Sequence, residues 1–496
     1  MDKRYIVVLE IGSSKIKGLA ASLGNYGDIS ILATEEIRTT NCVRYGKIQN
    51  IQEVSAHIND IIRKLENNPA LSHGKVTDLF IAFGGRSLST KFVQAKTKFP
   101  QAIEITDETV ARLKRDASFS MVTDKQTLDI VPRSFSVDNS QVKKIVGTVG
   151  SQLNAEFTAI IISPENRRNL ELLKFDGRSF ACHYVIRPTA IADLVLTADE
   201  KQLGCVLIDF GAETTTIVIY KDDALQSIVT LPIGSRNITR DLMIGLSMTE
   251  DQAEQAKLNN GSALPPSAET NPSPTESDII NFTQARAGEI VANILHQIDA
   301  AGFKPQALAS GLIITGGGIK LRNFLQFIKA QTKMPVRVAA IDGSLQFRCD
   351  IPGYDRNDNI DVLAIAKYAA ENSDINCIEL PQYEEAPDDK DDFVDDQPVR
   401  HHGRRQRQVD DDDLLNDDYD DIPTSQAPTV KGTSHSPVGR NTVKAPVDDD
   451  IDSGLGVDPE TENNGALSNA IASIKEKLAK FWQKDIDDED LNAPTE

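Results

Sequence analysis

The stretch Cys205–Tyr220, CVLIDFGAETTTIVIY, holds the residues best suited to bind phosphate. An apolar run ends in Asp209, a turn with Gly211 follows, and a threonine-rich run alternates out of the turn. The backbone N–H groups of such a glycine turn point at an anion, and threonine hydroxyls add donors. An acid at the end of a strand can hold a hard divalent cation through water. The stretch therefore predicts a strand, a phosphate-sized turn and a second strand.

The N-terminal stretch Tyr5–Ser22, YIVVLEIGSSKIKGLAAS, repeats this pattern. The residues that stand where Asp209, Gly211 and Thr214–Thr215 stand in the later copy are Glu10, Gly12 and Ser14–Lys15. Two acid-x-Gly-x-x-Ser/Thr hairpins indicate a duplicated α/β fold that holds phosphate between its halves. The alternative is two ordinary hairpins with turn glycines, and the pair alone does not decide between them.

A third motif is the segment Gly311–Gly318, GLIITGGG, in which a buried strand ends in three glycines before a helix. Three glycines allow close backbone approach, and the helix offers its N-terminus to a phosphate or a flat base. Alone, the segment is better explained as a tight turn, which accounts for most single glycine clusters. Behind two phosphate hairpins, it fits the third wall of one nucleotide cleft.

The elements that must position these motifs follow from hydrophobic spacing. Gln52–Leu65 and Ile279–Ala301 carry apolar residues at helical spacing. The segment Ser87–Ile162 has a different pattern, in which strand-like runs surround one helix that Thr106 can cap. This pattern predicts a small α+β insertion. The four prolines of Asn259–Ser277 predict a flexible loop.

The composition excludes several classes of protein. The chain has 496 residues and a net charge of −21, and from Glu384 onward it is dense in aspartate, which predicts an acidic disordered segment. No basic footprint for nucleic acid is present. No pair of the five cysteines has metal or redox-motif spacing, and they are expected to be reduced core thiols. The N-terminus does not read as a signal peptide, and no apolar run is long enough to span a bilayer, so any membrane contact is expected to be peripheral.

The three motifs resemble those of the actin-like ATPase superfamily. The first phosphate motif, the second phosphate motif and the adenosine motif are matched in turn by Tyr5–Ser22, Val206–Tyr220 and Gly311–Leu321. Within the superfamily the chain resembles the FtsA family of bacterial cell-division proteins. The segments that carry this closer resemblance are Leu128–Ala159, Pro188–Gly204 and Gly234–Asp241.

The resemblance implies a two-lobed α/β fold, actin-like and ribonuclease H-like, with an inserted α+β subdomain, a disordered acidic linker and a C-terminal amphipathic helix. In the family's terms, the implied boundaries are 1–86, 163–204 and 346–383 for subdomain 1A, 87–162 for the inserted subdomain 1C, 205–234 and 305–345 for subdomain 2A, 235–304 for subdomain 2B, 384–465 for the linker, 466–484 for the membrane-targeting helix and 485–496 for an acidic tail.

The resemblance also implies ATP and Mg²⁺ as cofactors. The residues implied to hold the phosphates are Gly12, Ser13, Ser14, Lys15, Gly211 and Thr214, with Glu10 and Asp209 near Mg²⁺ through water. Gly316 and Gly317 are implied to face the adenosine. Glu254 and Lys257 are similar to a ribose-contacting pair, although an i,i+3 pair on a helix is otherwise a solvated ion pair.

Two residues depart from the superfamily pattern. Glu10 stands where an aspartate is usual, and its extra methylene moves the carboxylate in a metal shell that tolerates little distortion. Arg187 stands before Pro188, where filament-forming members place a Glu or Gln that positions the attacking water. Arginine cannot act as a base. We therefore expect tight ATP binding with slow or absent hydrolysis.

The segment Ala466–Lys484 predicts an amphipathic helix that lies in a membrane interface. Its apolar side consists of Leu467, Ile471, Ile474, Leu478, Phe481 and Trp482, and its cations include Lys475 and Lys480. Such cations suit anionic headgroups. The alternative is docking on the chain's own core or on a partner protein.

The family resemblance implies three kinds of partner: copies of the chain in an actin-like filament, the anionic membrane surface, and the acidic-apolar tail of the tubulin-like ring protein FtsZ. That tail is expected on about Ser235–Gly302, with Arg286 and Lys257 as exposed basic candidates, unless Arg286 only packs on its own helix.

Two other functions remain open at this point. One is a pilus-assembly adaptor of related fold, whose terminus needs no amphipathic anchor. The other is a sugar or acetate kinase of the same superfamily, which needs a catalytic acid beside the acceptor hydroxyl, so Arg187 and the inserted subdomain argue against it.

Overall fold

The computed structural model describes residues 3–24, 27–121, 123–266, 271–341 and 347–381. The acidic segment and the C-terminal amphipathic helix predicted above lie outside the described residues. Among the described residues, no helix combines the length and apolar character that crossing a membrane requires.

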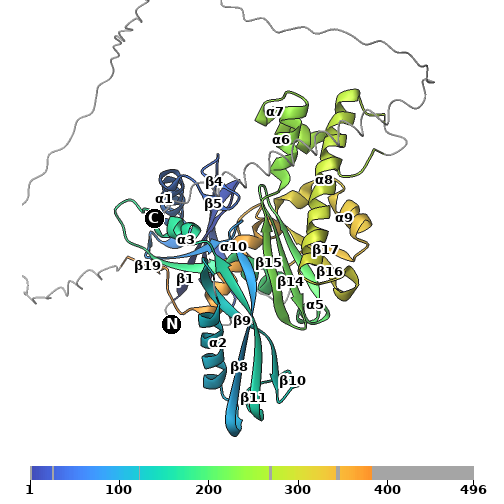
Figure 1. Cartoon of the computed structure of the whole chain (residues 1–496). Coiled ribbons are helices and arrows are strands. Elements are labelled where there is room, and N and C mark those ends of the chain that lie inside the picture. The colour runs from blue at the N-terminus through green and yellow to red at the C-terminus, as the bar shows by residue number, and fades with distance from the viewer. Residues whose placement is uncertain (1–2, 25–26, 122, 267–270, 342–346, 382–496) are drawn as a thin grey trace, which may run out of the picture. The chain divides into compact units, whose positions relative to one another are not determined.

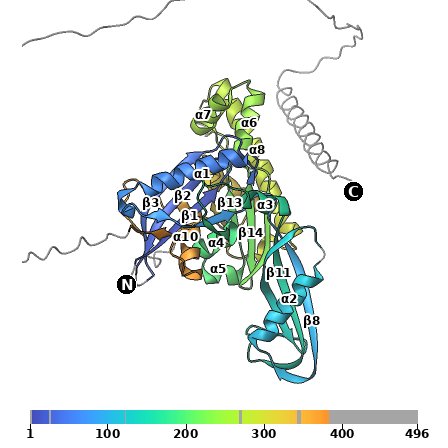
Figure 2. The same cartoon turned by 90° about the vertical axis from the view of Figure 1, so that its left-hand side faces the viewer.

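The first lobe is built on a six-stranded sheet in the order β12-β7-β1-β2-β3-β18. Its strands are β1 (Arg4–Ile11), β2 (Lys15–Leu23), β3 (Ile29–Arg38), β7 (Asp78–Phe83), β12 (Ala181–Ile186) and β18 (Phe347–Cys349). Strands β1, β2 and β3 form an antiparallel meander, whereas β7 and β12 follow parallel to β1. Helix α1 (Ile51–Glu66) packs along β2 and β3, as Figure 2 shows. Helices α4 (Arg187–Val195) and α10 (Ile360–Asn372) pack against each other, with α10 also against β1.

The second lobe repeats this topology in the order β15-β14-β13-β16-β17. Its strands are β13 (Cys205–Phe210), β14 (Thr215–Lys221), β15 (Ala224–Leu231), β16 (Gly311–Thr315) and β17 (Val336–Val338). Again three antiparallel strands are followed by two parallel ones. Helices α8 (Pro274–Ala300) and α9 (Phe324–Thr332) lie beside this sheet (Figure 1). The duplicated α/β fold predicted from the two hairpins is therefore confirmed.

The central strands of both sheets are buried on two faces. Strand β1 is buried at all but its end positions, and β16 is buried throughout. One apolar core joins α1 and α10 to the first sheet and to one face of the second sheet, including Leu207 and Ile313. A second core joins α8 and α9 to the other face of the second sheet. These runs explain why apolar patterning alone located the central strands.

The inserted subdomain contains β8 (Ser89–Glu104), α2 (Asp107–Ser120), β9 (Gln126–Val137), β10 (Ser140–Val142) and β11 (Val149–Ile162). The predicted cap is present, since the Thr109 N–H donates to Thr106 Oγ1 at 3.4 Å. Its sheet joins that of the second lobe where Ser89 on β8 pairs with Val229 on β15. The long strands β8, β9 and β11 extend away from the two lobes (Figure 1).

A small helical subdomain is formed by α6 (Ser235–Gly245), α7 (Glu250–Asn260) and the first part of α8. The predicted flexible loop Asn259–Ser277 was too long at both ends. Helix α8 begins at Pro274, because Ser273 and Glu276 form a capping box and proline suits the first helical position.

The remaining elements are short. They are β4 (Val43–Arg44), β5 (Lys47–Ile48), β6 (Lys75–Val76), β19 (Ile378–Glu379), α3 (Pro164–Glu171), α5 (Ala198–Leu203) and the 3₁₀ helices η1 (Pro69–Leu71), η2 (Pro305–Ala307), η3 (Gly317–Lys320) and η4 (Asn357–Asn359).

Candidate functional site

The two predicted phosphate turns have the same backbone geometry. The Gly12 N–H donates to the Lys15 carbonyl at 3.0 Å, and the Gly211 N–H donates to the Thr214 carbonyl at 2.9 Å. Lys15 is thus the counterpart of Thr214. The strand registers leave the same number of residues in both turns, so the two turns align residue by residue from Gly12 and Gly211. The predicted correspondence of Ser14 with Thr214 was therefore wrong by one residue.

The acids of the two hairpins are joined by Arg187. Its Nη1 lies 2.6 Å from Glu10 Oε1, and its Nη2 lies 2.9 Å from Asp209 Oδ2. The Glu10 side chain is 4% exposed, that of Arg187 15% and that of Asp209 16%, so the pairs are largely shielded from water. Arg187 reaches this position because it is the first residue of α4, directly after β12. A Cβ on Gly84 would lie 3.3 Å from Arg187 Nε, so a glycine at the end of β7 leaves room for the guanidinium.

The triple-glycine segment lies against the second of these acids. Gly316 has φ +93°, and a Cβ there would lie 2.6 Å from Asp209 Oδ1 and 2.5 Å from the Phe210 carbonyl oxygen. A Cβ on Gly317, in contrast, would meet no heavy atom within 4 Å. The two hairpins and the glycine segment are therefore brought together at Asp209 and Arg187.

The charges around Arg187 are largely shielded from water and alternate in sign. Lys17 Nζ lies 2.8 Å from Asp361 Oδ2, close to Glu10. Burial raises the pKa of Glu10 to about 7, against the opposing effect of Arg187. Burial would lower the pKa of Arg187, but Asp209 and Glu10 together hold it above its ordinary value. Arg187 is consequently a fixed cation between the two acids.

Glu10 and Asp209, as the structure arranges them, do not fit the predicted Mg²⁺ site. Glu10 and Asp209 each contact the Arg187 guanidinium directly, so the position between their carboxylates holds a side-chain cation. Mg²⁺ needs near-octahedral oxygen ligands and keeps several waters. Glu10 and Arg187 both depart from the superfamily pattern, but their pairing could not be predicted from the sequence.

A second cluster surrounds Glu213, the residue before Thr214 in the second turn. Glu213 is fully buried. It accepts a hydrogen bond from the Tyr45 N–H at 3.0 Å and pairs with Arg236 at 3.3 Å and with Arg240. Sequence reasoning missed these three charged residues. The sequence pattern that could have revealed the cluster is the four-residue spacing of Arg236 and Arg240, which places both side chains on one face of α6.

Ser13 of the first turn joins the same cluster. Its carbonyl accepts from Arg236 Nη1 at 3.2 Å, and its Oγ accepts from the Gly46 N–H at 3.0 Å. The β4–β5 hairpin, which carries Tyr45 and Gly46, therefore contacts both turns.

The other predicted nucleotide residues have partners within the protein. Lys257 Nζ lies 2.7 Å from Glu254 Oε2 and 3.0 Å from Thr239 Oγ1, which ties α7 to α6. Lys257 is buried, so the expectation that it is exposed was wrong. Lys15 is half-buried and pairs with Glu36 at 2.6 Å.

Arg286 is also buried, at 4% exposure, and the expectation that it is an exposed basic contact was wrong. It donates to both carboxylate oxygens of Asp241, from Nε at 2.7 Å and from Nη2 at 2.6 Å, and it also pairs with Glu289. The sequence did not show that α6 places Asp241 against α8.

A cavity of about 860 Å³ lies at the root of the inserted subdomain, lined by Phe80, Pro132, His183, Tyr220 and neighbouring residues. It contains none of the predicted nucleotide residues. The case for a nucleotide site therefore rests on the turns and on Gly316.

The duplicated sheet order and the paired turns define the actin-like fold class. A solved PilM–PilN type IV pilus biogenesis complex shares this fold, with a TM-score of 0.50, 15% sequence identity and coverage of 74% of this chain and 96% of that chain.

Sequence comparisons identify the family to which the chain belongs. The family model described as "Cell division protein FtsA" matches residues 206–360, and "SHS2 domain inserted in FTSA" matches residues 85–161. The cell division protein FtsA of Porphyromonas gingivalis is 30% identical over 342 residues, covering 65% of this chain and 70% of that protein. FtsA of Bacillus subtilis is 25% identical over 360 residues, covering 68% and 79%. The chain belongs to the FtsA family of cell-division proteins, which confirms the predicted resemblance.

Proposed function

We propose that this protein binds ATP between the two hairpin turns, assembles into actin-like filaments on the cytoplasmic face of the membrane, and anchors the FtsZ ring there during septum assembly. The observation that carries the proposal is that Arg187 joins Glu10 and Asp209, the acids of the two hairpins, and that Gly316 lies against Asp209, in a member of the FtsA family. A pilus-assembly adaptor, the main alternative, has support from the fold alone.

Within this proposal, the turns supply the phosphate contacts. The N–H groups of Gly12 and Gly211 close the turns themselves. We infer that the N–H groups of the next turn residues, Ser13–Ser14 and Ala212–Glu213, point at the phosphates. Gly317 is open on its outer side and would allow the adenine ring to approach the backbone.

Slow or absent hydrolysis follows from Arg187. A guanidinium cannot accept a proton from an attacking water. Because Arg187 also pairs with both acids, neither Glu10 nor Asp209 is left as an unengaged carboxylate. The proposed role is therefore structural, with nucleotide binding supporting assembly.

Membrane attachment is proposed through Ala466–Lys484. A truncation after Gly465 is expected to abolish binding to vesicles that contain anionic lipid, because it removes six apolar side chains and the cations around them. Sedimentation with vesicles would measure this, and electron microscopy with ATP on an anionic lipid monolayer should show filaments only with the full chain. Since one helix binds weakly, filament formation strengthens attachment by avidity. Equal pelleting of both chains would contradict the membrane role.

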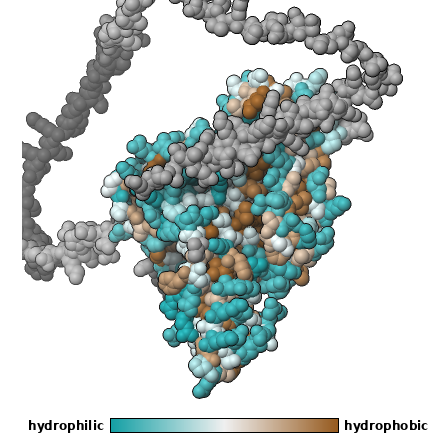
Figure 3. Space-filling view, viewed as in Figure 1, coloured by the Kyte–Doolittle hydropathy of each residue, from teal (hydrophilic) through white to brown (hydrophobic). Residues whose placement is uncertain are grey.

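The FtsZ tail is proposed to dock on the small helical subdomain. Figure 3 shows apolar surface there, and Ile244 and Leu258 are large apolar side chains exposed at 80% and 64%. Ile244→Glu is expected to weaken binding of an FtsZ tail peptide at least tenfold, about 1.4 kcal/mol, because it places a charge on an apolar contact. Val149→Glu, at an exposed apolar position of the inserted subdomain, is the matched control.

Peptide binding measured by fluorescence anisotropy distinguishes the two variants. Equal affinity of Ile244→Glu and Val149→Glu would place the tail elsewhere. Arg286→Glu is not a clean test, because it would bury a further acid beside Asp241.

A further inference from the structure

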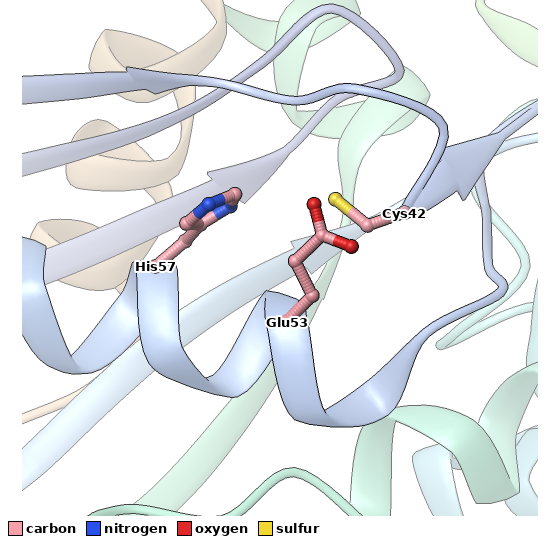
Figure 4. A group of neighbouring side chains, drawn as sticks. All are labelled: Cys42, Glu53 and His57. Carbon is pink, nitrogen blue, oxygen red and sulfur yellow. The ribbon is translucent and has the colours of Figure 1, made fainter. Parts of the chain in front are cut away.

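Cys42, Glu53 and His57 form a group of side chains with metal-ligating atoms. One ligand atom from each lies within 4.8 Å of the other two. Figure 4 shows Glu53 and His57 on successive turns of α1, with the Cys42 sulfur beside the Glu53 carboxylate and the His57 ring on the same side of the helix. None of the three belongs to the proposed nucleotide site.

The local backbone holds this group together. The Cys42 carbonyl accepts hydrogen bonds from the N–H groups of Gln49 at 2.8 Å and Asn50 at 3.2 Å, which fixes the cysteine at the start of α1. Asn50 caps the helix by accepting from the Glu53 N–H at 3.1 Å, and its amide lies 3.3 Å from Glu53 Oε2. An outer hydrogen bond of this kind orients a metal-binding carboxylate.

The imidazole of His57 has a buried polar atom without a partner. Its Nδ1 is shielded from solvent and makes no hydrogen bond with any part of the chain that the structure describes. A buried polar atom without a hydrogen bond costs about 1–3 kcal/mol. Coordination of a metal by the imidazole would compensate for this cost.

We propose that Cys42, Glu53 and His57 bind one Zn²⁺ ion, with water as the fourth ligand. A thiolate, an imidazole and a carboxylate suit zinc and not Mg²⁺ or Ca²⁺, which prefer oxygen ligands alone. In a tetrahedral zinc site, ligand atoms lie about 3.3–3.6 Å apart, so ligand atoms that lie within 4.8 Å of one another need to approach by up to about 1.2–1.5 Å. Because Cys42 is fully buried and the other two are partly exposed, the open position faces outward.

Zinc binding must release a proton from the thiol. Zinc binds the thiolate form of cysteine, so the thiol proton is lost when the ion binds. On binding, the S–H bond breaks, the S–Zn bond forms and the proton passes to solvent. The ion would then hold the start of β4 against α1. Since the β4–β5 hairpin contacts Glu213 and Ser13, the site is connected to both turns.

The test is zinc titration of the full chain in competition with a chromophoric chelator. His401 and His402 are replaced by alanine throughout, because adjacent histidines can bind zinc on their own. We expect one Zn²⁺ per chain, with affinity at least tenfold lower in Cys42→Ser and in His57→Gln. Cys349→Ser and His73→Gln are matched controls and should bind as the parent does. Bound Co²⁺ should show thiolate charge-transfer absorption that Cys42→Ser lacks.

Absence of stoichiometric zinc in the parent, or equal affinity in Cys42→Ser and His57→Gln, would overturn the proposal. Circular dichroism establishes that each variant is folded. If Cys42→Ser does not fold, Glu53→Gln serves in its place, because glutamine retains the size of the side chain. In that case, unchanged zinc affinity in both single variants, Glu53→Gln and His57→Gln, would overturn the proposal.

Discussion

Arg187→Met is expected to lower the free energy of unfolding by about 3–5 kcal/mol, since it leaves the buried Glu10 carboxylate and the largely shielded Asp209 carboxylate without their cation. Arg187 contacts Glu10 at 2.6 Å and Asp209 at 2.9 Å, and it is the direct link between the acids of the two lobes. Lys17 cannot replace it, because its ammonium is held by Asp361 at 2.8 Å. Urea unfolding of the full chain, followed by circular dichroism without nucleotide, would measure the loss.

Two further variants separate the ion pairs from simple loss of packing. Adding Glu10→Gln to Arg187→Met should restore part of the stability, because an uncharged amide costs less to bury than a carboxylate. Arg168→Met, at an exposed position on α3, should change the stability by less than about 0.5 kcal/mol. If Arg187→Met were no more harmful than Arg168→Met, the bridge would contribute nothing to the fold.

The two lobes could be predicted because their signals are local. Apolar runs that end in an acid and a glycine turn specify a strand, a turn and a strand wherever they occur. The same local signals gave α1 nearly to its ends and Thr106 as the cap of α2. The start of α8 was missed because four prolines suggested a loop, although Pro274 follows a capping serine and begins a helix.

The site was predicted less completely, because its partners are distant in the sequence. Arg187 could be recognised as unable to act as a base, but its contact with Glu10 depends on how β12 lies in the sheet. From the sequence, Arg286 could be recognised only as a basic residue on a helix. The packing of α6 against α8 is what pairs it with Asp241 and buries it. Side-chain pairing between elements is a tertiary property that no local pattern contains.

Gly316 and Gly317 are adjacent, yet their replacement is expected to have different effects. Gly316 has φ +93° and ψ 162°, a conformation open essentially to glycine alone, and a Cβ there would overlap the Phe210 carbonyl at 2.5 Å. Gly316→Ala should therefore lower the free energy of unfolding by about 3–5 kcal/mol, from backbone strain and overpacking together. Gly317→Val should leave stability nearly unchanged, because its side chain would enter open space.

The second substitution then tests the nucleotide proposal without disturbing the fold. If the adenosine of ATP lies against Gly317, the valine side chain takes part of its space, and the affinity should fall at least tenfold, or about 1.4 kcal/mol. Isothermal titration of the full chain with ATP would measure the affinity, and urea unfolding would measure both stabilities. If a folded Gly317→Val bound ATP with unchanged affinity, the adenosine would not lie against the glycine segment. The ion pairs of Arg187 with the acids of both hairpins would then be explained by their contribution to the stability of the fold alone.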